Sequence, residues 1–325
     1  MKTRILRNLF VIALSLIYTV TFAQEDFSKN YEETYEVNKN TFFKISNKYG
    51  KVHIENINTD KVEILVTVNV ETKKKEKADD FFKKIDINID KSGNNITAET
   101  EIDGDLKAKE FSIDYYIKMP SYVTIDLTNK YGEIFINKLN SKSTINCKYG
   151  HLQINELLTS ELEKLATVNI KYSKGAINNC DYLNLDIKYS ELEIDKSRAV
   201  YVNSGYSQLE FDKAYILKIV SKYDPNFEIN EATKIDLQGK YSGYDIGKLA
   251  NSLTGSISYS NIEIDHVNKG FEKIDLTSKY GNVEINVDDE ASYNLNAQNE
   301  YGNIECKIED KIKSDGMSKI VEGYV

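Results

Sequence analysis

Tyrosines and carboxylates recur at fixed positions of a short repeated frame, and both kinds of side chain could bind a ligand. The frame is a Lys-Tyr-Gly or Lys-Tyr-Ser step followed by alternating apolar residues, as in NKYGKVHI from Asn47, NKYGEIFI from Asn129 and IKYSELEI from Ile187. A row of aromatic rings could form a strip for sugars. A row of carboxylates could hold calcium, because clustered carboxylate oxygens are its preferred ligands.

The tyrosines also have a purely structural interpretation, which we favour. Aromatic stacking contributes about 0.5 to 1.5 kcal/mol per pair, so a ladder of rings that fills each corner of a coil would stabilise the fold. Such regularity suits stability better than it suits ligand specificity. The predicted structural ladder consists of Tyr131, Tyr149, Tyr172, Tyr189, Tyr206, Tyr223, Tyr241, Tyr259, Tyr280 and Tyr301.

Charged residues form two further rows on outward positions of the frame. Lysine precedes the tyrosine in eight of eleven copies, and an acid stands four positions after it in six copies. Unit charges about 4.8 Å apart in water repel by only about 0.9 kcal/mol, so a solvated face explains the acidic row without calcium. The lysines would keep the surface soluble and protect strand edges. As a candidate interaction face we select Lys188, Glu193, Glu210, Lys240, Glu263 and Glu284.

Catalytic and metal-binding patterns are missing from the sequence. The three histidines, His53, His151 and His266, stand in separate repeats, and a metal cluster requires more ligands than that. No GxSxG, HExxH, phosphate loop or dinucleotide fingerprint is present. We therefore predict no catalytic residues, no metal site and no cofactor.

The spacing of the tyrosines predicts the fold. From Tyr131 onward successive tyrosines lie 17 to 23 residues apart, and a period near twenty indicates a solenoid. Around Tyr189, Leu185 and Ile187 alternate with polar residues before the turn, and Leu192 and Ile194 do so after it. Each repeat thus holds two short strands that must stack on neighbouring repeats. The predicted fold is all-β, a right-handed parallel β-helix with an inserted β-rich N-terminal subdomain that carries one helix.

The frame is interrupted once, and this gives the predicted division of the chain. Residues 1–23 read as a cleavable signal peptide, with a short basic start and an apolar run. Residues 24–54 hold the N-terminal strands and first coil, and residues 55–123 an inserted capping subdomain with a helix at Lys75–Lys84. Residues 124–310 hold the β-helix repeats. Residues 311–325 show no comparable cap, so they fold over the last coil or that coil is incomplete.

Charge and cysteine content narrow the class of partner. Removal of Lys2, Arg4 and Arg7 from the 42 basic residues leaves 39 against 51 acidic residues, a formal charge of −12. Nucleic acid is therefore not an expected partner. The three cysteines cannot all pair within one chain, and we expect Cys147, Cys180 and Cys306 to be buried thiols in a protein exported to the periplasm or the cell surface.

The repeated NKYGxVxI coils after a signal peptide resemble the bacterial putative adhesin family, a domain of unknown function, from about Tyr35 to Cys306. The resemblance implies a β-helix and carries over no catalytic residues. We therefore expect a non-enzymatic protein that binds a cell-surface, matrix or envelope component, either protein or glycan, without a transmembrane segment after signal cleavage. Two alternatives are a periplasmic scaffold or envelope-stress accessory protein and a polysaccharide-cleaving β-helix enzyme. The single arginine after the signal peptide, Arg198, speaks against the enzyme.

Overall fold

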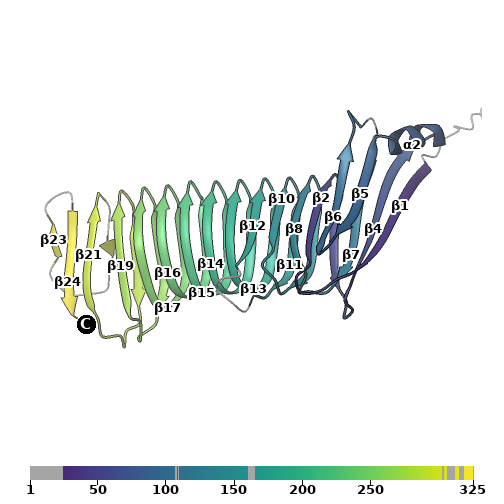
Figure 1. Ribbon diagram of the computed structural model, residues 1–325. Coiled ribbons are helices and arrows are strands. Elements are labelled where there is room, and N and C mark those ends of the chain that lie inside the picture. Colours follow the sequence, from purple (N-terminus) through teal and green to yellow (C-terminus); the bar gives the residue numbers. More distant parts are fainter. Residues whose placement is uncertain are drawn as a thin grey trace, which may run out of the picture.

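The computed structural model describes residues 25–106, 108, 110–159, 165–301, 304–305, 312–314 and 318–324. It is a β-solenoid whose coils stack side by side along one axis, with a splayed group of strands and the helix at the N-terminal end (Figure 1). This confirms the predicted β-solenoid. No helix within the described ranges is long and apolar enough to cross a membrane. The predicted signal peptide lies outside the described residues.

Parallel pairing between successive coils builds two sheets. Strand β8 (Thr124–Lys130) pairs with β10 (Thr144–Lys148), and β10 pairs with β12 (Ala166–Lys171), so the strands before each tyrosine form the first sheet. Strand β9 (Glu133–Leu139) pairs with β11 (His151–Leu157), so the strands after each tyrosine form the second sheet. Because the pairing is in register, equivalent frame positions form straight rows along the axis.

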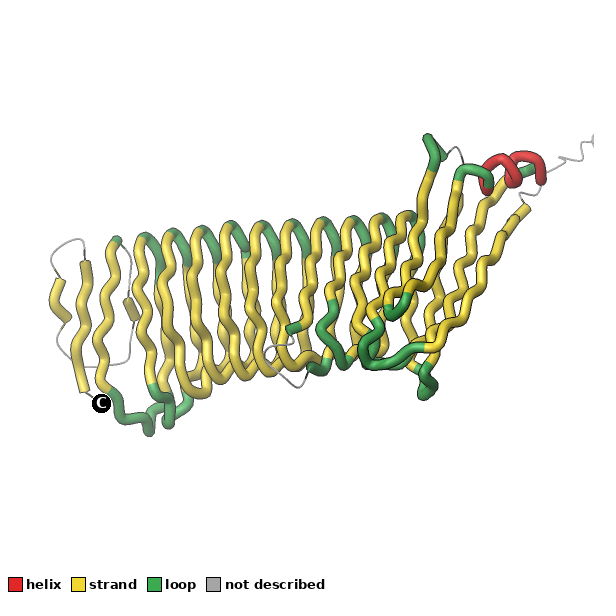
Figure 2. The backbone as a smooth tube through the Cα atoms, viewed as in Figure 1, coloured by secondary structure: helices red, strands yellow, loops and turns green. Residues whose placement is uncertain are grey.

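In each coil up to β17 (Gly243–Ser258), one long strand serves both sheets, beginning with β13 (Lys174–Lys188). Its first half pairs with β11 in the second sheet, and its second half pairs with β12 in the first. The tyrosine turns therefore form the row of loops along one edge in Figure 2, while the opposite edge of these middle coils is continuous strand. The solenoid continues through β14 (Glu191–Gly205), β15 (Gln208–Lys222), β16 (Asn226–Lys240), β17 (Gly243–Ser258), β18 (Asn261–Val267), β19 (Lys273–Lys279), β20 (Val283–Val287), β21 (Asn294–Glu300) and β22 (Ile304–Glu305).

Apolar residues of alternate positions meet between the two sheets and form the core. Leu185, Ile187, Leu192 and Ile194 are all at most 2% exposed, which confirms the inward positions predicted from the frame. Cys147 and Cys180 are buried free thiols, as expected, and burial raises the pKa of Cys180 to about 12. The prediction for Cys306 falls outside the described residues.

The N-terminal end extends both sheets beyond the first coil, which consists of β2 (Phe42–Lys48) and β3 (Val52–Asn56). Strands β7 (Glu110–Met119), β4 (Lys61–Thr72) and β1 (Glu25–Glu36) follow β3, and the last two pairings are antiparallel. Strands β6 (Asn95–Ile102) and β5 (Ile85–Ser92) follow β2.

Helix α2 (Lys75–Phe82) lies at this end and buries Ala78 and Phe81. The helix and strands predicted here are confirmed, although the helix ends two residues earlier than expected. The domain boundaries at residues 55 and 123 stay a prediction.

At the other end the chain returns in the opposite direction. Strand β24 (Ser318–Tyr324) pairs antiparallel with β21, and β23 (Ile312–Ser314) pairs antiparallel with β24. The frame contains no signal for this reversal, because the segment lacks the Lys-Tyr-Gly step. The added strands supply backbone partners to β21. The sequence alone left two alternatives, a segment that folds over the last coil and an incomplete last coil.

Candidate functional site

The eleven tyrosines of the frame form one continuous stack along the edge where the two sheets meet. Neighbouring ring centroids lie 4.7 to 5.3 Å apart, and the interplanar angles are 1° to 19°. The stack begins at Tyr49, whose ring also meets Phe111 edge-on at 5.3 Å, and runs to Tyr301. We call this row of tyrosines the tyrosine edge.

Every tyrosine of the edge has a left-handed backbone conformation, with φ between 51° and 66°. This conformation costs a residue that carries a Cβ about 1 to 2 kcal/mol, which is why glycine usually occupies it. Turn preferences point to the glycine that follows in copies such as Tyr131-Gly132, but the structure assigns the positive φ to the tyrosine. The sequence holds no rule from which this could be read.

The rings do not fill the corners of the coil as we expected, because they lie on its outside. Ten of them are between 38% and 51% exposed. Each interior ring has a neighbour on both faces, so only ring edges and hydroxyl groups reach solvent. A sugar or a nucleic-acid base that stacks on aromatic rings needs an open face, and the interior of the tyrosine edge offers none.

A second row, of buried hydroxyl groups, lies directly beneath the rings. Ser190 Oγ accepts a hydrogen bond from the Ser173 amide at 3.1 Å and donates one to the Lys188 carbonyl at 2.8 Å. Ser207 Oγ repeats this pattern one coil further along, toward the Ser190 amide and the Gly205 carbonyl. The Lys-Tyr-Ser step of the frame gave no prediction of this row, although a serine that recurs directly before an apolar strand was a usable signal.

Asp224 takes the place of a serine in this row. Its carboxylate accepts hydrogen bonds from the Ser207 amide at 2.7 Å and from the Lys222 amide at 3.2 Å. The side chain is fully buried, and burial raises the pKa of Asp224 even though these hydrogen bonds lower it in part. A carboxylate here is therefore a less stable solution than the serine of the neighbouring coils.

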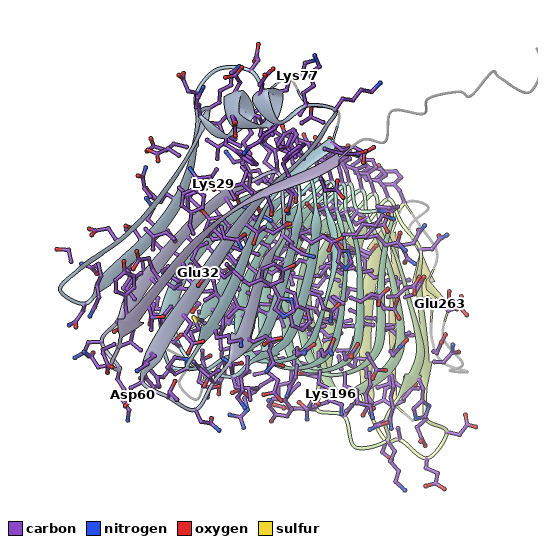
Figure 3. The ribbon with its side chains drawn as sticks, turned by 90° about the vertical axis from the view of Figure 1, so that its right-hand side faces the viewer. Lys29, Glu32, Asp60, Lys77, Lys196 and Glu263 are labelled. Carbon is purple, nitrogen blue, oxygen red and sulfur yellow. The ribbon has the colours of Figure 1, made fainter. Side chains whose placement is uncertain are left out.

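The structure divides the six residues of the predicted interaction face between two sheets. Lys188 and Lys240 end strands of the first sheet, directly before the tyrosine edge. Glu193 and Glu210 lie in register on the second sheet, and Glu263 and Glu284 continue that row. Figure 3 looks along the solenoid and shows Glu263 on its outer surface. The lysines and the acids therefore do not share one face.

The acidic row includes Glu228, which pairs in register with Glu210 on one side and Asp245 on the other. The repeated frame did not predict Glu228, because the insertion of Pro225 places it five positions after Tyr223 instead of four. Burial, and then the charges of Glu193 and Glu228, raise the pKa of Glu210. The charge of Glu284 is the main cause that raises the pKa of Glu263. No group of three or more side chains in the described part of the chain is arranged to hold a metal ion.

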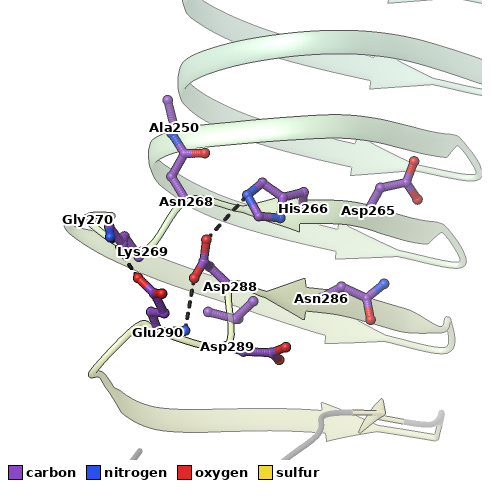
Figure 4. Close-up of a pocket in the computed structure, with 11 residues that line it drawn as sticks. Ala250, Asp265, His266, Asn268, Lys269, Gly270, Asn286, Asp288, Asp289 and Glu290 are labelled. Carbon is purple, nitrogen blue, oxygen red and sulfur yellow. Dashed lines mark hydrogen bonds and ion pairs between the residues drawn. The ribbon is translucent and has the colours of Figure 1, made fainter.

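A concave region of about 890 Å³ lies near the C-terminal end, between the loops that follow β18 and β20 (Figure 4). Four of its ionisable groups lie in two pairs: Lys269 Nζ lies 2.8 Å from Glu290 Oε2, and His266 Nε2 lies 3.8 Å from Asp288 Oδ2. Small-molecule sites are mostly apolar with a few convergent polar groups, whereas this region is lined mainly by charged and amide side chains. It does not present a general base beside a nucleophile.

Comparisons with known proteins give only distant similarities. No protein-family model matches the sequence, and no curated protein matches it. Among solved structures, a putative adhesin from Parabacteroides merdae is 12% identical, with a TM-score of 0.40 over 79% of this chain and 95% of that chain.

Two further structures have the same description. A putative adhesin from Parabacteroides distasonis is 10% identical (TM-score 0.38), covering 79% of this chain and 97% of that chain. One from Bacteroides fragilis is 14% identical (TM-score 0.34), covering 79% and 96%. Scores at this level carry no argument about function, so the family resemblance of the NKYG frame stays a prediction.

Proposed function

We propose that this protein is a non-enzymatic, exported β-solenoid that acts by binding another component through its outer surface, in the manner of an adhesin. The observation that supports this function is the tyrosine edge, an unbroken row of ring edges and hydroxyl groups that spans the solenoid. A row of this kind can make many weak contacts at a regular spacing. Such contacts suit an extended partner better than a small ligand.

The charged groups of the solenoid also favour surface binding over catalysis. Acids of the second sheet stand in register at the spacing of strands, and not as a pair flanking a cleft as a glycoside hydrolase requires. In the concave region, both basic side chains, Lys269 and His266, already lie beside carboxylates of the same region.

The location of the protein in the cell and its effect on the attachment of cells test this proposal. Intact cells that produce the protein are treated with an external protease, alongside a periplasmic control protein, and attachment to glycan and matrix arrays is compared between producing and deletion strains. We expect digestion of the protein and weaker attachment of the deletion strain. Digestion with unchanged attachment would contradict adhesion.

Protection from the protease would instead favour the scaffold alternative, in which the protein binds a partner inside the envelope. That alternative predicts a stable partner in pull-downs from the periplasm. Release of products from a panel of acidic polysaccharides would contradict the non-enzymatic proposal.

A further inference from the structure

The first sheet carries a row of lysines that borders the tyrosine edge along its N-terminal half. Backbone pairing places five lysines in unbroken register, each directly before a tyrosine of the edge. All five are exposed or half-buried. These lysines are Lys48, Lys130, Lys148, Lys171 and Lys188.

None of these five lysines forms an ion pair within the described part of the chain. Lysines at other positions of the coils do pair with acids of neighbouring coils, such as Lys138 with Glu156 at 2.7 Å and Lys213 with Glu231 at 3.7 Å. The fold therefore allows cross-coil ion pairs, yet this row places like charges next to each other. Neighbouring charges about 4.8 Å apart repel by only about 0.9 kcal/mol in water, so the row is stable in solvent, and an anionic partner would remove that repulsion.

The tyrosines beside this row add to its preference for anions. An aromatic ring carries negative charge density on its face and positive density at its edge, and the stack leaves only the edges outward. The ammonium groups of Lys48 and Lys148 lie 4.6 and 5.1 Å from the centroids of the rings that follow them, and this attraction holds both groups at the tyrosine edge. Ring edges, hydroxyl donors and ammonium groups thus form one electropositive strip.

The outward row on the other side of the lysines is uncharged over most of this length. Asn169 Nδ2 donates to Asn146 Oδ1 at 2.8 Å, and Asn146 Nδ2 donates to Thr128 Oγ1 at 3.2 Å. Amide and hydroxyl groups of this kind hydrogen-bond to the hydroxyl groups of sugars.

The charge density of the row distinguishes between polyanions. The row offers one positive charge about every 4.8 Å, the spacing of strands, whereas duplex DNA carries one negative charge per about 1.7 Å. A densely charged polymer would also be repelled by the acids elsewhere on a chain with a net charge of −9. A polymer with about one anionic group per sugar fits both conditions.

We propose that the strip formed by these five lysines and the tyrosine that follows each of them binds a linear acidic polysaccharide. This inference rests on the proposed function and names the ligand of the adhesive surface. The polymer lies along the solenoid axis, with its carboxylates toward the lysines and its hydroxyl groups toward the asparagines.

Binding of the full chain to immobilised polygalacturonate tests the proposal. The variant K130Q/K148Q/K171Q is compared with K138Q/K213Q/K269Q, which removes the same charge from lysines that are ion-paired elsewhere on the solenoid. We expect about tenfold weaker binding for the first variant, from surface ion pairs of about 0.2 to 1 kcal/mol each, and a smaller effect for the second. Equal effects of the two variants would overturn the proposal.

Two other polymers separate the classes of ligand. Methyl-esterified polygalacturonate keeps the sugar backbone without its charges, and we expect it not to bind. Duplex DNA and vesicles with anionic lipid present dense charge, and we expect both to bind more weakly than polygalacturonate. Tighter binding of the ester, the DNA or the vesicles would overturn the assignment to an acidic polysaccharide.

Deletion of a single coil provides a second test, in which the register of the lysine row changes without any amino-acid substitution. Beyond Lys188 the row is interrupted at Gly205 and resumes at Lys222. Deletion of residues 190–206 joins Tyr189 to Ser207 and brings Lys188 into register with Lys222. Deletion of residues 207–223 also removes one coil of 17 residues, but it removes Lys222 and leaves the interruption.

We expect the first deletion to bind polygalacturonate at least as tightly as the parent and the second to bind more weakly. The net charges of the two deletion variants differ by two units. The variant K138Q/K213Q/K269Q changes the net charge by three units, so its loss of affinity is the largest difference that net charge alone could cause between the two deletions. The reverse order of affinities would contradict the proposal.

If the protein supports attachment of cells but does not bind polygalacturonate, this inference fails while the proposed function stands. If the purified chain binds polygalacturonate but the deletion strain attaches normally, the proposed function fails instead.

Discussion

Replacement of one tyrosine by alanine and by glycine tests whether the tyrosine edge stores backbone strain that stacking offsets. Tyr189 stacks on Tyr172 at 5.0 Å and on Tyr206 at 4.9 Å, and its φ is 52°. Either substitution removes both stacked pairs, a loss of about 1 to 3 kcal/mol. Alanine retains the cost of the left-handed conformation, about 1 to 2 kcal/mol, whereas glycine does not.

Glycine is therefore expected to be the milder substitution, contrary to its usual effect in a strand. Its greater freedom in the unfolded chain costs about 0.5 to 1 kcal/mol, which leaves Tyr189→Gly more stable than Tyr189→Ala by about 0.5 to 1 kcal/mol. The assay is urea unfolding, in which a shift of the midpoint at constant slope reports the change in the free energy of unfolding. As a control, Tyr215→Ala removes a tyrosine that is 52% exposed and outside the edge, and we expect a change within about 0.5 kcal/mol.

An alanine variant as stable as the glycine variant would refute the reasoning about strain. Loss of less than about 0.5 kcal/mol in both variants would refute the stabilising role of the stack. Equal losses at Tyr189 and Tyr215 would show that the effect is one of exposed tyrosines in general.

Three further predictions concern the core and the row beneath the rings. Ser190→Ala leaves a buried amide of the neighbouring coil without an acceptor and should destabilise the fold by about 1 to 3 kcal/mol in urea unfolding. Asp224→Ser should stabilise the protein at neutral pH. The folded state raises the pKa of Asp224, so the contribution of this carboxyl group to the free energy of unfolding is present in acid and lost as pH rises. The stability gained by the substitution should therefore shrink on acidification from pH 7 toward pH about 4. Ile187→Asp buries a charge between stacked coils and should prevent folding or lower the melting temperature severely, while Glu193→Gln, on the exposed second sheet, should melt like the parent; similar melting of both would overturn the inward and outward positions.

Much of the fold is predictable because in-register stacking turns a sequence period into straight rows. The alternation around Tyr189 assigns Leu185 and Ile187 to the core, and the interruption of the frame marks the N-terminal strands and the helix at Lys75. The antiparallel return of β24 is not predictable in this way, since it depends on a pairing between distant segments that share no repeat. The frame fixes which residues lie in one row but not which sheet a row belongs to. For that reason the predicted interaction face combined lysines and acids that the fold separates.

The left-handed tyrosines were not predictable either, because local turn preferences assign that conformation to glycine. Glycine would satisfy the turn at every coil without strain, and yet the chain places tyrosine there eleven times. Ten of these tyrosines remain 38% to 51% exposed, and the stack returns about as much free energy as the backbone conformation costs.

Stability alone thus explains neither the choice of tyrosine nor the unpaired lysines beside it, since the same coils pair lysine with glutamate at other positions. These two features coincide along one edge, from Lys48 to Tyr189. The acidic row from Glu193 to Glu284 also places like charges in register, but it does not border the tyrosine edge. Backbone strain of the kind that the tyrosines carry clusters at sites that bind ligands. For this reason we propose the tyrosine edge as the binding surface, in preference to the acidic sheet and the concave region.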